Sequence, residues 1–182
     1  MEYAQLCASK GINIFVEKPF SDNLDGFESF KKIILHKQLY FYVSFQRRFH
    51  PYLMEISEII KSKKLGKIFN AKFNVSSYVP EWYKYENFLE LYACRAELGG
   101  GVLLTEIHEI DLCYWYFGLP DSVFCAGGNY FEEKLDVEDT AHLTLIYKNF
   151  SVQISLCFMQ KHTQRDLFIA GTKGYVEWKT EG

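Results

Sequence analysis

The sequence predicts an α+β fold: an antiparallel open sheet with helices on one side, preceded by the last part of a parallel α/β domain. Residues 3–45 follow a helix–strand–helix–strand rhythm, which is typical of parallel strands. Residues 140–147 and 150–158 place apolar side chains at every second position on either side of a two-residue turn. This period is typical of an antiparallel hairpin with one buried face. The two expected parts are residues 1–46 and 47–182.

The parallel part is expected to contain two helices and two short strands. Residues 12–16 form a continuous apolar run of the kind found in parallel strands covered on both faces, and residues 39–45 form a second strand. Gly11 ends the first helix. The predicted helices are residues 3–10, with Tyr3, Leu6 and Cys7 on one side, and a segment capped by Asp22, with Leu24, Phe27, Phe30 and Ile34 at helical spacing.

In the second part, helices and one long strand precede the hairpin. Pro51 is well placed to begin a helix that Gly66 closes, and Gly118 and Pro120 stop a second, apolar helix. A further hairpin is expected close to the end of the chain. The predicted segments are a long strand at 68–78, an irregular and then helical stretch at 80–98, an apolar helix at 102–117, and strands at 166–170 and 175–178.

Composition excludes several classes of function. The chain has 182 residues, a net charge of −3 and no long basic block, which argues against a nucleic-acid or anionic-membrane partner. Its five cysteines are odd in number and none are at CxxC spacing, which argues against a zinc site or a disulfide framework. No apolar stretch is long enough to span a membrane, so a soluble, cytoplasmic protein is expected. The 18% aromatic content suits both packed sheet faces and carbohydrate-stacking pockets.

A charged motif follows the first predicted strand directly. Glu17, Lys18 and Pro19 come at its carboxyl end, which is the edge where α/β sheets bind ligands. The simpler interpretation is that the three residues begin a solvated loop.

The segment after the glycine run 99–101 is a second candidate. On a continuous helix His108 shares a face with Thr105 and Asp111, whereas Glu106 and Glu109 point elsewhere. An imidazole flanked by a hydroxyl and a carboxylate is a reasonable general base. The alternative is a half-buried structural histidine bonded to Asp111. A metal site is not expected, because the segment lacks a histidine pair at i, i+4.

Taken together, these motifs resemble the glucose–fructose oxidoreductase and inositol dehydrogenase family (Gfo/Idh/MocA). Strand–Glu-Lys-Pro is the most recognisable motif of that family, and YAQLCASKGINIFVEKPFSDNLDGFE resembles its whole helix–strand–motif–helix passage. Three further stretches resemble family segments in the right order. They are FQRRFHP, with Arg48, Phe49 and Pro51 at the motif positions, ELGGGVLLTEIHEIDLCYWYFG, and GTKGYVEW.

The resemblance implies an NAD(P)-dependent oxidoreductase that transfers a hydride between the nicotinamide and a sugar, cyclitol or nucleotide sugar. It also implies that residues 1–46 are the C-terminal remnant of a Rossmann-like dinucleotide-binding domain, and that residues 47–182 form a substrate and oligomerisation domain. Lys18 would bind and polarise the reacting oxygen, and His108 would be the acid/base. Both would contact substrate. Glu17, Lys18 and Pro19 would lie near the cofactor, and Thr105 and Asp111 would support His108.

Two departures from the family pattern qualify this interpretation. Leu104 stands where the family has an aspartate four residues before the histidine, and Thr105 is the nearest substitute. No glycine-rich phosphate-binding turn precedes residue 12. We therefore expect a fragment of the enzyme with weak or absent binding of NAD or NADP. The alternative is a non-catalytic sugar-binding or oligomerisation domain, and we expect a homo-oligomer formed through the antiparallel sheet.

Overall fold

The computed structural model describes residues 1–131 and 135–180, and it divides into two compact units, Met1–Phe45 and Gln46–Gly182. The first unit contains the helices α1 (Glu2–Ser9) and α2 (Phe27–His36) and the strands β1 (Ile14–Glu17) and β2 (Phe41–Ser44). The two strands pair in parallel, as predicted from the helix–strand rhythm.

Three details of the first unit differ from expectation. Helix α1 buries the small residues Ala4 and Ala8, whereas Tyr3 and Leu6 are exposed. Helix α2 begins at Phe27 and not near Asp22, because Gly26 immediately before it has a positive φ of 74°. Strand β1 is half-buried along one face and exposed along the other. On its other face the exposed Phe15 stacks on Tyr42 of β2, with ring centroids 5.5 Å apart.

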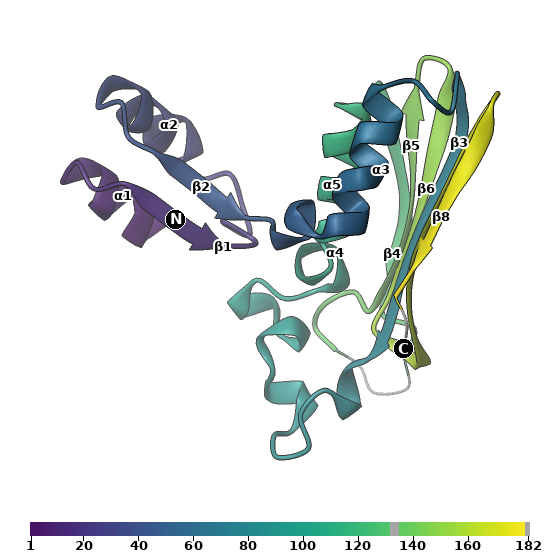
Figure 1. Ribbon diagram of the computed structural model, residues 1–182. Helices are drawn as coiled ribbons and strands as arrows, with labels where there is room; N and C mark the ends of the chain where they lie inside the picture. Colours follow the sequence, from purple (N-terminus) through teal and green to yellow (C-terminus); the bar gives the residue numbers. More distant parts are fainter. Residues whose placement is uncertain (132–134, 181–182) are drawn as a thin grey trace. The chain divides into compact units, whose positions relative to one another are not determined.

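The second unit is a six-stranded sheet with helices on one face (Figure 1). The strand order is β4-β5-β6-β3-β7-β8. Every neighbouring pair is antiparallel except β3 and β6, which are parallel, so the sheet is mainly antiparallel, as predicted, with one parallel pair. The strands are β3 (Ile68–Tyr78), β4 (Ser122–Gly128), β5 (Thr140–Tyr147), β6 (Phe150–Cys157), β7 (Met159–Gly171) and β8 (Gly174–Lys179).

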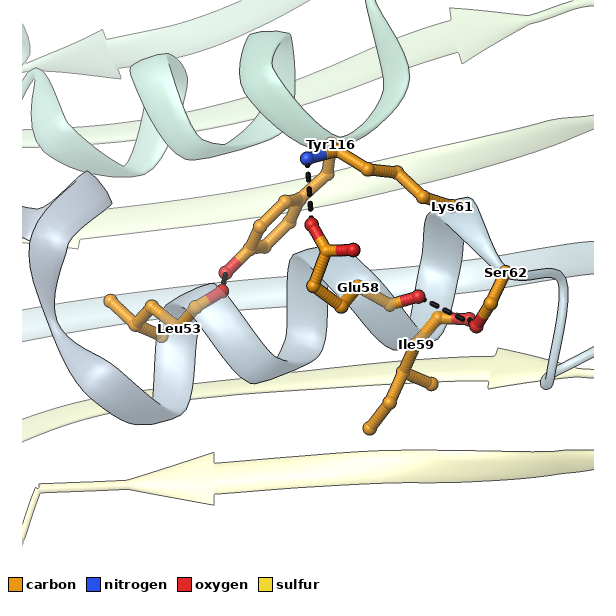
Figure 2. A network of polar contacts seen from close by, with 6 residues as sticks. All are labelled: Leu53, Glu58, Ile59, Lys61, Ser62 and Tyr116. Atoms are coloured by element: carbon orange, nitrogen blue, oxygen red, sulfur yellow. Dashed lines mark hydrogen bonds and ion pairs between the residues drawn. The ribbon is translucent and has the colours of Figure 1, made fainter.

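Helices α3 (Pro51–Lys61), α4 (Val102–Thr105) and α5 (His108–Phe117) accompany the sheet. Helix α3 begins at Pro51 as predicted. The Tyr116 hydroxyl of α5 donates a 2.9 Å hydrogen bond to the Leu53 carbonyl of α3, which joins the two helices above the sheet (Figure 2). The same figure shows the end of α3, where Lys61 pairs with Glu58. Five short 3₁₀ segments complete the unit: η1 (Gln46–Phe49), η2 (Val79–Glu81), η3 (Phe88–Glu90), η4 (Tyr92–Cys94) and η5 (Ala96–Leu98).

The core lies between the helices and one face of the sheet. The predicted alternation is confirmed, because every second residue of β5 and β6 is buried. The buried members on these two strands are Ala141, Leu143, Leu145, Tyr147, Val152, Ile154 and Leu156. None of the helices within the described ranges is long and apolar enough to cross a membrane.

Candidate functional site

The glycine run shapes the backbone ahead of α4. A Cβ on Gly100 would lie 2.4 Å from the Tyr92 carbonyl oxygen, and a Cβ on Gly101 would lie 2.5 Å from a carboxylate oxygen of Glu138. Glu138 also accepts a 3.0 Å hydrogen bond from the backbone N–H of Leu103, so it caps the start of α4. Gly100 and Gly101 therefore allow a close approach of the chain to itself.

The segment that carries His108 is broken and is not the single helix expected for residues 102–117. Helix α4 ends at Thr105 and α5 begins at His108. Both side chains are buried, and that of His108 is only 4% exposed. The Thr105 side chain lies beside the hydroxyl of Tyr92, which is on η4. Burial of Tyr92, together with the charge of Glu106, raises the pKa of that hydroxyl above 10.0, so it is protonated at neutral pH.

Asp111 is bound by an arginine of the motif found in the sequence. The Arg48 Nε–H and Nη2–H donate to the two carboxylate oxygens of Asp111, at 2.8 and 2.6 Å. This bidentate geometry is the strongest that a guanidinium and a carboxylate form. Arg48 also lies over the Trp115 ring, 5.9 Å from its centroid. Both oxygens of Asp111 are therefore engaged in anchoring α5 to η1.

Glu106 and Glu109 converge on Arg165, a residue that the sequence analysis did not select. Arg165 of β7 pairs with Glu106 at the end of α4 and with Glu109 in the first turn of α5, the second contact at 3.2 Å. The Arg165 and Glu106 side chains are each 12% exposed, and that of Glu109 is 3% exposed. The sequence predicted that the two glutamates point away from the face of His108. In the structure both side chains reach Arg165 of the sheet. Their common partner is 56 or more residues away in sequence, so no local pattern could identify it.

A cavity of about 340 Å³ lies beside this ion-pair cluster. The cavity is lined by residues of η1, β3, β7 and the α4–α5 junction, all of them within the second unit. Its polar lining includes Arg47, Ser77, Glu106, Gln164 and Arg165, and the Trp82 side chain supplies an aromatic surface. A site for a small, hydroxyl-rich molecule commonly has this combination of size and lining.

The predicted residues of the first unit lie together at one edge of its parallel pair. Glu17 is the last residue of β1 and pairs in register with Ser44, the last residue of β2, and Lys18 and Pro19 follow directly. The motif therefore lies at the carboxyl end of a parallel strand, as predicted. A cleft shared by Lys18 and His108, which belong to different units, stays a prediction.

No group of three or more histidine, cysteine, aspartate or glutamate side chains within the described ranges is arranged to hold a metal ion.

Three solved structures that resemble this chain are each about twice as long as it is. The WlbA dehydrogenase from Bordetella pertussis, solved in complex with NADH and UDP-GlcNAcA, has a TM-score of 0.85 and 21% identity. GenD2 from gentamicin A biosynthesis, solved in complex with NAD, has a TM-score of 0.83 and 18% identity. Myo-inositol 2-dehydrogenase from Lactobacillus plantarum has a TM-score of 0.83 and 20% identity. These likenesses cover 97%, 98% and 97% of this chain but 51%, 50% and 53% of the other chains, so it spans about half their length.

A comparison with curated protein sequences gave no match. A family profile, by contrast, matches residues 53–177, which is more than half of the chain, and its description is the GFO/IDH/MocA C-terminal domain. The profile begins inside α3 and ends inside β8, so it covers the sheet, the glycine run and the segment that carries His108. The chain therefore belongs to the GFO/IDH/MocA family.

Proposed function

We propose that this chain is part of an NAD(P)-dependent oxidoreductase that transfers a hydride between the nicotinamide and a hydroxyl or carbonyl of a sugar, cyclitol or nucleotide sugar. In this proposal residues 1–46 are the end of the dinucleotide-binding domain and residues 47–182 bind the substrate. The observation that carries it is the family match, which includes the buried His108, two residues along the chain from Glu106 of the polar cavity that Trp82 also lines. The Glu17-Lys18-Pro19 motif at the end of β1 supports it.

The residues present fit the reacting end of the cofactor. β1 and β2 end side by side at Glu17 and Ser44, and ligands of α/β sheets bind at such carboxyl edges. Glu17, Lys18 and Pro19 would therefore lie against the nicotinamide end. When bound, the nicotinamide supplies or accepts the hydride. The pyrophosphate needs a glycine-rich turn and a helix N-terminus, and residues 1–12 contain no such turn.

Lys18 and His108 would divide the remaining chemistry. The Lys18 ammonium donates a hydrogen bond to the reacting oxygen and stabilises negative charge that develops on it. His108 takes the hydroxyl proton as the alcohol is oxidised and returns it in the reverse reaction. Thr105 and Asp111 would act through position, because Thr105 lies beside Tyr92 and Asp111 is bound by Arg48. Together they fix the two ends of the segment that carries His108.

The proposal can be tested with a form extended at its N-terminus by a segment that contains a glycine-rich turn. We expect this form to reduce NAD or NADP with a member of a panel of hexoses, inositols and nucleotide sugars. Lys18→Met and His108→Gln should each lower kcat by about 100-fold or more. Lys84→Met and His36→Gln, at exposed positions, are matched controls that should retain full activity. Wild-type rates in the Lys18 or His108 variant would contradict the assigned roles, and sugar binding without hydride transfer would favour the non-catalytic alternative.

Self-association through the uncovered face of the sheet is a second part of the proposal. This face carries exposed aromatic side chains, Phe124 on β4 and Tyr175 on β8, together with His142, Ile146 and Cys157 of the central hairpin. Exposed apolar groups over a sheet of this size favour association with a second copy.

A further inference from the structure

Arg47 lines the cavity beside Arg165 and has no ion-pair partner among the residues that the structure describes. Its lining has three charged residues: Arg47, Glu106 and Arg165. Arg165 and Glu106 pair with each other, and Arg165 also pairs with Glu109. Arg47 forms no ion pair within residues 1–131 and 135–180. The one carboxylate of this lining, Glu106, pairs with Arg165, and no ion pair joins it to Arg47 among the described residues.

Unsatisfied hydrogen-bonding groups also single out Arg47. The Arg47 Nε and the Ser77 Oγ are both shielded from solvent, and neither has a hydrogen-bond partner among the described residues. Both residues line the cavity, Arg47 from η1 and Ser77 from β3. A buried donor without an acceptor is costly, so native structures rarely leave one unless a ligand or water completes it. Both atoms are shielded from the cavity as well, whereas Arg47 as a whole is only half-buried, so a ligand in the cavity would meet the rest of its side chain.

We propose that Arg47 is a specificity-determining residue of this cavity and that it binds an anionic group, a carboxylate or a phosphate, carried by a sugar-sized ligand. A guanidinium presents parallel donors that match the two oxygens of such a group. Trp82 offers a ring surface for the sugar. The volume of about 340 Å³ lies near the lower end of the range for small-molecule sites, which is about 300–1,000 Å³. The sugar part of the ligand rests on the proposed function, whereas the anionic part rests on Arg47 alone.

The test is a comparison of glucuronate, glucose 6-phosphate and glucose as ligands of the 182-residue chain. Binding is followed by NMR through the backbone amides of Ser77 and Gln164, without cofactor and without turnover. We expect one or both of the charged sugars to bind about tenfold or more tightly than glucose, since hydrogen bonds to charged groups are the stronger ones. The two charged ligands distinguish a carboxylate from a phosphate. Arg47→Gln should bind the charged sugars and glucose about equally. Arg95→Gln, which changes an arginine outside the cavity, should keep the preference of the wild type.

Equal binding of all three sugars by the wild type, or an unchanged preference in Arg47→Gln, would overturn the inference. If Arg47→Gln does not give a native spectrum, Arg47→Lys decides in its place. This variant keeps the charge and loses the planar pair of donors, so a reduced preference supports the inference and an unchanged one overturns it. Equal binding of all three sugars would leave the proposed oxidoreductase function standing. Failure of hydride transfer in the extended form would leave the Arg47 preference untouched.

Discussion

Replacing Arg165 by methionine should be among the most destabilising single changes in the second unit. The substitution keeps much of the side-chain volume but removes the guanidinium that pairs with Glu106 and Glu109. Two carboxylates then remain close together, with side chains only 12% and 3% exposed. Removing one partner of a buried ion pair costs about 3–5 kcal/mol, because a buried charge is left uncompensated. That is a large fraction of the roughly 5–15 kcal/mol that stabilises a typical domain.

The assay is urea unfolding followed by circular dichroism, in which the midpoint should fall while the slope with denaturant stays the same. Arg95→Met is the matched control. Its ion pair with Glu97 is largely exposed, so the expected loss is below about 1 kcal/mol. The triple variant Arg165→Met, Glu106→Gln, Glu109→Gln should recover most of the stability lost in Arg165→Met, because no uncompensated charge remains buried. A loss in Arg165→Met as small as that in Arg95→Met would refute the reasoning.

Three further predictions concern alkaline pH, self-association and the cofactor. Burial raises the pKa of the Cys94 thiol from 9.0 to about 11 and that of the Tyr147 hydroxyl from 10.0 to about 12. Because the unfolded chain releases these protons at lower pH than the folded one, the contribution of these groups to stability should be full below pH 9 and fall as the pH rises toward 12. A melting temperature that stays constant over this range would contradict the prediction. Phe124→Lys should shift the mass in light scattering toward the monomer, whereas Tyr85→Lys, at an exposed position outside the sheet, should not; a wild-type monomer at tens of micromolar would argue against association. Calorimetry of the 182-residue chain with NAD(H) and NADP(H) should give a Kd on the order of millimolar, about −4 kcal/mol, and a micromolar Kd would mean that residues not identified here hold the pyrophosphate.

The regular parts of the fold were predictable because their signals are local. A period of two predicted the β5–β6 hairpin, and Pro51 predicted the start of α3. The break between α4 and α5 could not be predicted, since residues 102–117 contain neither glycine nor proline. The partner that holds the two sides of the break is Arg165, which lies far along the chain. The parallel pairing of β3 with β6 likewise depends on which strands meet in the folded sheet, and periodicity does not encode that.

The candidate site follows the same division between local and distant signals. The motif positions of Lys18 and His108 were readable, because each follows a recognisable strand end or glycine run. The role of Arg48 was visible only as part of a motif, and the structure adds its bidentate contact with Asp111. Arg47 gave no signal in the sequence, because an arginine on the surface and one facing a cavity look alike until the strands β3 and β7 are placed beside it.

The segment that carries His108 is held at both ends by residues that are distant in sequence. Asp111 is bound by Arg48 through both of its oxygens. Glu106 and Glu109 flank His108 in sequence, and both pair with Arg165 of β7. The same arginine therefore joins the end of α4 to the first turn of α5. In the proposed reaction these contacts would act through position, because they fix the backbone on both sides of the histidine.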